Sequence, residues 1–132
     1  MTQEEEKNLL LKDLCARLPY GVRYRHFTWN DEYGETYIAA QIYSINTDGY
    51  VKNCHDDETV YIDNVRPYLF PLSSMTEEQK KEYQYITERW MNDPAYSISN
   101  SIDWLNKHHF DYRGLIEKGL ALEAPEEMYK TE

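Results

Sequence analysis

The chain has 132 residues, enough for one ordinary domain or two very small ones, with a core adequate for stability without disulfides or bound metal. It carries 24 acidic and 14 basic residues, and its formal net charge of −10 repels nucleic acid and attracts basic partners. Direct DNA or RNA binding is therefore not expected. No apolar run approaches the roughly 20 residues that span a bilayer.

The start of the chain does not have the features of a secretory signal, because residues 2–7 are acidic and the apolar run 9–11 is too short. Cys15 and Cys54 lie far apart, without the CxxC spacing of metal or redox sites, and fit a reducing compartment. We therefore expect a cytoplasmic protein that needs no cofactor and binds no membrane.

Residues 1–72 predict an N-terminal helix followed by a small β-structure. Thr2 and Glu5 have the spacing of a capping box, and apolar residues then recur at intervals of three and four until Leu18-Pro19 ends the helix. From 20 to 65 the period changes to two, in four short segments joined by turns at 30–34, 46–49 and 55–58. Such strands bury one face by curling or by packing against a helix. The sequence therefore predicts a small antiparallel β-sheet or an SH3-like barrel.

The pattern of residues 73–132 predicts a C-terminal helical region packed on that β-structure, either as a second region or as part of one domain. An extended connector at 66–72 precedes it. A capping box at Thr76 and Gln79 opens a helix that reaches about residue 92 and ends at Asp93-Pro94. The predicted fold class is therefore α+β.

Beyond that helix, the pattern predicts a second one over 99–109, with Ile102 and Leu105 facing inward and Trp104 near the edge. Asp111 is expected to cap a last short helix over 112–118. Residues 123–132 have the composition of an exposed tail.

Two segments hold the residue types of chemical sites at the wrong spacing. The run 106–111 contains two adjacent histidines, which on a helix point about 100° apart, whereas helical zinc sites use i and i+4. In the run 54–57 a cysteine, a histidine and two aspartates follow one another in a turn, where side chains diverge. Nucleotide-binding, metalloprotease and hydrolase signatures do not occur. We therefore expect neither a metal site nor an enzyme.

Tyrosine is unusually frequent, with 13 residues of 132. Tyrosine suits half-buried strands and also protein interfaces, so either a strand-rich domain or a binding face explains it. The partner expected for such a face is another protein, and the chain itself is expected to be a monomer or a weak homodimer. The candidate contact residues are Tyr37, Tyr43, Trp104, His108, Tyr112 and Arg113.

Three segments carry a resemblance: KDLCARLPYGV at 12–22, YLFPLSSMT at 68–76 and DWLNKHHFDYRGLI at 103–116. They resemble a family of small uncharacterised proteins from gut Bacteroides genomes and their phages or prophages, and the last segment is the most specific. Together they cover about a quarter of the chain. The resemblance implies a genetic setting and transfers no catalytic residue.

The negative charge, the aromatic residues and the missing catalytic motifs favour a non-enzymatic protein-binding or accessory module of the phage or prophage type. One alternative is an acidic inhibitor or nucleic-acid mimic, which binds a nucleic-acid-processing protein through carboxylates gathered on one face. Another is an unrecognised enzyme, which requires a concave pocket holding polar groups with perturbed titration.

Overall fold

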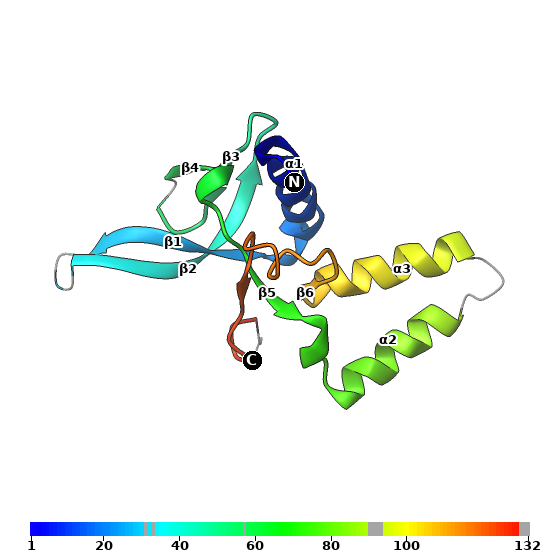
Figure 1. Ribbon diagram of the computed structural model, residues 1–132. Helices are drawn as coiled ribbons and strands as arrows, with labels where there is room; N and C mark the ends of the chain where they lie inside the picture. The colour runs from blue at the N-terminus through cyan, green and yellow to red at the C-terminus, as the bar shows by residue number, and fades with distance from the viewer. Residues whose placement is uncertain (31, 33, 57, 90–93, 130–132) are drawn as a thin grey trace.

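The computed structural model describes residues 1–30, 32, 34–56, 58–89 and 94–129. Figure 1 shows an N-terminal helix, a curled four-stranded antiparallel half-barrel, then two helices and a small parallel sheet. The predicted α+β class is confirmed. In the described residues the antiparallel sheet stays open, with its first and fourth strands at the edges, so it is a half-barrel rather than a closed SH3-like barrel.

Helix α1 spans Gln3–Arg17 and begins as predicted, because the Thr2 hydroxyl accepts a hydrogen bond from the Glu5 amide at 3.1 Å. The helix ends before Pro19, where the chain tightens into a 3-10 turn over Leu18–Tyr20. Leu10 and Leu14 of α1 are buried against the half-barrel.

The half-barrel follows the predicted alternation closely. Its strands are β1 (Arg23–Asn30), β2 (Gly34–Ile45), β3 (Tyr50–Asn53) and β4 (Thr59–Tyr61), in the order β1-β2-β3-β4. β1 and β2 pair over the full length of β1 and project as a long hairpin arm (Figure 1). The register of β2 against β3 shifts between Ile42 and Ser44, where the sheet curls.

Helices α2 (Glu77–Arg89) and α3 (Pro94–Lys107) lie side by side, and their rings Tyr83 and Trp104 are 5.5 Å apart. The second capping box is confirmed, since the amides and side chains of Thr76 and Gln79 bond reciprocally at 2.8 and 3.1 Å. The predicted end of that helix near residue 92 lies outside the described residues.

Three predictions for α3 were wrong. The helix begins at Pro94 instead of 99, because proline is tolerated in a first helical turn, where its missing N–H has no partner to lose. Ile102 is exposed while Trp104 is buried, since α3 turns its Trp104 side towards Tyr83 of α2 and Phe110. Leu105 is buried as predicted.

The C-terminal part of the chain departs most from the prediction. The connector contains β5 (Tyr68–Pro71), the central strand of a parallel sheet with β6 (Phe110–Asp111) and β7 (Leu122–Glu123). The exposed tail was a wrong prediction, because the Ala124 side chain is buried and its amide donates to the Leu69 carbonyl at 2.8 Å.

The predicted last helix is a series of turns. The Asp111 carboxylate does accept hydrogen bonds from the Leu115 and Ile116 amides, both at 2.9 Å. Gly114, however, has a φ of 73°, and a left-handed residue at that point interrupts a right-handed helix. The capping role was therefore right and the helix was wrong.

The larger apolar core draws on both sides of position 72. It contains Leu10, Leu14, Val22, Tyr24, Ala40, Ile42, Val51, Ile62, Val65, Leu69, Leu115, Leu120 and Ala121. A smaller cluster of Trp104, Leu105 and Phe110 joins α3 to β6, and Tyr83 and Ile86 of α2 pack against it. No helix in the described parts of the chain is long and apolar enough to cross a membrane.

An ionic network is buried where α1 meets the C-terminal part of the chain. Asp13 and Arg17 are both fully buried and pair at 2.9 Å, and Arg113 Nε lies 3.1 Å from the same carboxylate. Arg17 also donates to the Phe110 carbonyl at 2.6 Å. These bonds join elements about a hundred residues apart in sequence.

Candidate functional site

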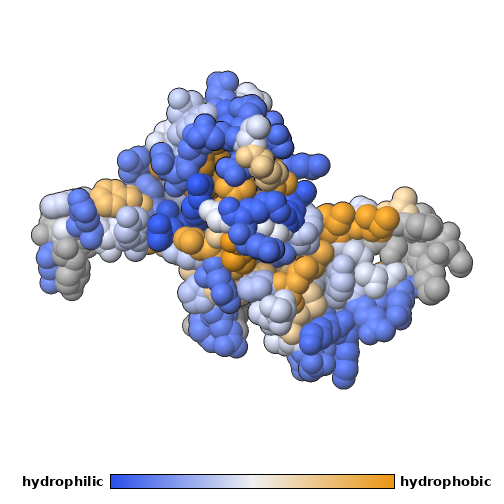
Figure 2. All heavy atoms as spheres, in the orientation of Figure 1, coloured by the Kyte–Doolittle hydropathy of each residue, from blue (hydrophilic) through white to orange (hydrophobic). Residues whose placement is uncertain are grey.

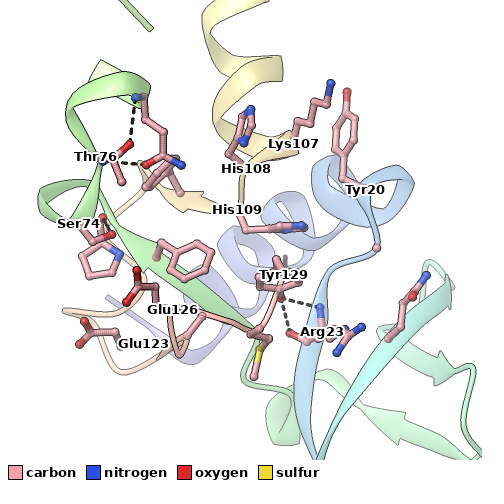
Figure 3. A pocket seen from close by; sticks show the side chains of 18 of the residues that line it. Tyr20, Arg23, Ser74, Thr76, Lys107, His108, His109, Glu123, Glu126 and Tyr129 are labelled. Atoms are coloured by element: carbon pink, nitrogen blue, oxygen red, sulfur yellow. Dashed lines mark hydrogen bonds between the residues drawn. The ribbon is translucent and has the colours of Figure 1, made fainter. Parts of the chain in front are cut away.

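A cleft of about 980 Å³ opens where the base of the hairpin arm meets the end of α3, β5 and the C-terminal segment (Figure 3). The 3-10 turn after α1 contributes Pro19 and Tyr20, and β1 and β2 contribute Arg23 and Gln41. Its volume lies at the upper end of the range of small-molecule sites.

The two rims of the cleft carry opposite charge. Lys107, His108 and Tyr20 stand together on one side, and Glu123 and Glu126 stand on the other (Figure 3). The floor between them includes the Phe70 and Phe110 rings. A cleft with an apolar floor and rims of both signs suits a segment of polypeptide, which has apolar side chains and polar groups of both signs.

A stacked pair of rings forms one wall. His109 and Tyr129 lie parallel within 19°, with their centroids 3.7 Å apart. The Tyr129 hydroxyl accepts from the Arg23 amide and donates to the Tyr68 carbonyl, both at 2.8 Å. This hydroxyl therefore holds the C-terminal segment against β1 and β5.

Both rings have perturbed titration, and packing explains it. Burial, reinforced by the nearby Arg17 charge, lowers the pKa of His109 to about 4, and burial raises the pKa of Tyr129. His109 Nδ1 is buried without a hydrogen-bond partner, and the Tyr129 hydroxyl is occupied by main-chain groups. The two shifts therefore follow from the packing of the rings in the wall of the cleft.

Replacing Tyr129 by phenylalanine is expected to lower the free energy of unfolding by about 1–3 kcal/mol, because the Arg23 amide and the Tyr68 carbonyl lose their shared partner. Urea denaturation of both proteins measures the difference. Tyr85→Phe, at an exposed tyrosine of α2, is the matched control and should change little. Equal midpoints for wild type and Tyr129→Phe would contradict the anchoring role.

The cleft continues onto one face of the hairpin arm. Arg23 pairs with Gln41 in the cleft wall, and every second pair beyond it lies on the same face: Arg25 with Ala39, Phe27 with Tyr37, and Trp29 with Glu35. We call the side chains of Arg25, Phe27, Trp29, Glu35 and Tyr37 the hairpin face.

The hairpin face is aromatic and exposed. Phe27, Trp29 and Tyr37 are 47%, 66% and 58% exposed. Phe27 meets Tyr37 edge to face at 5.7 Å, and the Arg25 guanidinium lies 4.7 Å from the centre of the Tyr37 ring. Figure 2 shows apolar surface on the arm among hydrophilic side chains. Phe27, Tyr37 and Arg25 therefore support one another, and all three rings remain exposed to solvent.

The six predicted contact residues fall in separate places. Tyr37 belongs to the hairpin face and His108 to the rim of the cleft, whereas Tyr43 is exposed farther along β2. Trp104 is only 6% exposed and stacks on Phe110 with centroids 5.7 Å apart. Tyr112 and Arg113 bond to each other beside the buried Asp13.

The histidines of the run 106–111 do not converge. His108 packs on Trp104 with centroids 4.4 Å apart, and His109 stacks on Tyr129. The Asp111 carboxylate is held by two main-chain amides.

Phe27 and Trp29 of the hairpin face were not among the predicted contact residues. Their signal was the alternation of Arg23, Arg25, Phe27 and Trp29 along one strand. Comparison of the chain with protein-family models, with curated proteins and with solved structures finds no match.

Proposed function

We propose that the protein is a non-enzymatic protein-binding module that holds an extended segment of a partner protein along the hairpin face and into the adjoining cleft. The observation that carries the proposal is the group of three exposed aromatic side chains on one face of a projecting arm. Tryptophan, tyrosine and phenylalanine are enriched in the energetic centres of interfaces, and exposed apolar patches mark such sites.

The main chain of β1 supports an extended partner. β1 is an edge strand, and the Arg23 and Arg25 amides point away from β2, towards the Tyr129 hydroxyl and the Arg66 carbonyl. Because strand residues alternate, the main-chain groups of Phe27 and Trp29 face this same edge. These main-chain groups lie beyond the part of β1 that the Arg66 carbonyl and the Tyr129 hydroxyl cover. A partner strand added at that edge gains main-chain hydrogen bonds and aromatic contacts together.

The net charge of −10 favours a partner that is basic overall. An acidic mimic would need a face of one sign, whereas on α2 the residues Glu77, Glu78 and Glu82 alternate with Lys80 and Lys81. The hairpin face itself mixes arginine and glutamate with rings. We therefore assign the contact to the aromatic residues and the attraction to the overall charge. The accessory role in a phage or prophage setting, which the family resemblance implies, is part of the proposal.

Site-specific photo-crosslinking tests the proposal. A photoreactive phenylalanine at position 37, on the hairpin face, is compared with the same group at position 85, an equally exposed tyrosine of α2. In nuclease-treated host lysate, position 37 should capture a protein that position 85 does not. The captured protein is then purified for binding measurements.

For that purified partner, Trp29→Ser should weaken binding by at least tenfold, as expected for a central interface tryptophan. Tyr85→Ser should leave it unchanged, and both variants should keep the wild-type melting temperature because both side chains are exposed. Equal capture at positions 37 and 85, or unchanged affinity of Trp29→Ser, would overturn the proposal. Binding abolished by 0.5 M salt and untouched by Trp29→Ser would indicate the acidic inhibitor instead.

A further inference from the structure

A second group of polar side chains lies on the opposite face of β1. His26 is only 3% exposed, and its Nε2 lies 3.0 Å from Asp56 Oδ2 and 3.5 Å from Glu58 Oε2. Asp56 and Glu58 come from the turn between β3 and β4, with side chains 30% and 61% exposed. One imidazole nitrogen and two carboxylates therefore meet at the edge of the half-barrel, where solvent reaches the carboxylates.

The charges of this group are unbalanced. Two carboxylates approach one imidazole nitrogen, which carries at most one proton and satisfies at most one of them well. Among the described residues, His26 is the ion-pair partner of both, and neither carboxylate has a lysine or arginine within ion-pair distance. The group has the composition and charge to take up a cation.

Distances and supporting bonds match a metal centre. Ligand atoms around a tetrahedral zinc ion lie about 3.3 Å apart, given bonds of about 2.0–2.1 Å. The two separations from His26 Nε2, 3.0 and 3.5 Å, bracket this value, and all three ligand atoms lie within 4.8 Å of one another. His26 Nδ1 bonds to the Tyr24 hydroxyl at 3.0 Å, which fixes the ring orientation. Asn53 donates to the other oxygen of Asp56 at 3.1 Å and holds that carboxylate in place.

We propose that His26, Asp56 and Glu58 bind a divalent transition-metal ion of the zinc type. A metal-bound Nε2 carries no proton, so in the bound form the imidazole proton lies on Nδ1, next to the Tyr24 oxygen. The two carboxylates neutralise the charge of the ion. Three protein ligands leave at least one position for water, and the ion ties β1 to the β3–β4 turn.

Calorimetric titration with zinc chloride tests the proposal on the full chain without an affinity tag. Wild type should bind one zinc ion per chain, and its melting temperature should rise by roughly 5–10 °C at a hundredfold excess over Kd. Glu58→Gln and Asp56→Asn should each weaken binding at least tenfold. Glu58 is exposed, so Glu58→Gln folds normally and keeps the test decisive even where Asp56→Asn is destabilised.

Two neighbours serve as controls. His55 and Cys54 are exposed residues beside the same turn, and His55→Gln and Cys54→Ser should both retain zinc binding. Magnesium, which prefers all-oxygen sites, should give no heat. Absence of zinc binding would overturn the proposal. Binding that survives Glu58→Gln and Asp56→Asn but disappears in Cys54→Ser or His55→Gln would equally do so.

Discussion

Asp13→Ala is expected to lower the free energy of unfolding by about 3–5 kcal/mol, the largest effect of any single change considered for this chain. Asp13 is fully buried and is the acidic partner of both Arg17 and Arg113. Removing it leaves the fully buried Arg17 without a counter-charge. Arg17 keeps its hydrogen bond to the Phe110 carbonyl, but a neutral carbonyl does not replace the lost carboxylate charge, and Arg17 Nη1 already lacks a partner.

Chemical denaturation followed by circular dichroism measures this loss. Glu77→Ala is the matched control, because the Glu77–Lys80 pair is exposed and its removal should cost less than about 0.5 kcal/mol. Asp13→Leu combined with Arg17→Met should regain part of the loss, since it removes both buried charges together. Similar losses for Asp13→Ala and Glu77→Ala would contradict a buried network that holds α1 to the C-terminal part of the chain.

Elements whose signals are local could be predicted from the sequence. Both capping boxes, at Thr2 and at Thr76, open helices as expected, because a cap involves residues only three positions apart. The turn at 46–49 and the strands beside it also follow local rules. Asn46 Oδ1 accepts from the Asp48 and Tyr50 amides, both at 3.0 Å.

Elements that depend on distant partners could not be predicted in this way. β5 is a strand because its main chain pairs with residues near 110 and 122, and nothing within 66–72 specifies those partners. The same holds for Tyr129, whose hydroxyl bonds to Arg23 and Tyr68. A polar C-terminal segment without periodicity therefore suggested an exposed tail, although one side chain anchors it.

The candidate site was predictable only in part, for a related reason. Alternation placed Phe27, Trp29 and Tyr37 in strands, but both faces of β1 carry rings, with Tyr24 and His26 on the other. Which face is buried is decided by α1 and β5, and therefore by tertiary packing. Likewise, side chains of the run 54–57 diverge along the chain, whereas the Asp56 carboxylate meets His26, which lies thirty residues away in sequence.

The loss of folding free energy in acid should report the burial of His109 directly. The pKa of His109 is about 4 in the folded chain against a reference value of 6.5. Between these values the unfolded chain binds more protons than the folded one, so the stability contributed by neutral His109 is present above pH 6.5 and is lost as pH falls towards 4. The expected loss is roughly 3 kcal/mol.

His109→Asn isolates this contribution. His109 has a φ of 60°, which asparagine tolerates better than most residues, and asparagine does not titrate. The variant should be less stable at pH 7, because the stack on Tyr129 is lost. Between pH 7 and pH 4 the free energy of unfolding should fall in both proteins, but the fall should be roughly 3 kcal/mol smaller in the variant than in wild type. The pKa of His108 is also lowered, mainly by burial, and its effect is present in both proteins and cancels in the difference.

Urea denaturation at half-unit steps of pH gives the two curves, and NMR of the imidazole carbon-bound protons gives the His109 midpoint itself. Asp56, whose pKa is lowered to about 2 by the Glu58 amide and His26, titrates below this window and does not interfere. Parallel curves for the two proteins, or a His109 midpoint near 6.5, would show that this ring is hydrated and that Tyr129 does not seal it. Diverging curves with a midpoint near 4 would establish that His109 is dry and packed against Tyr129 in the wall of the cleft.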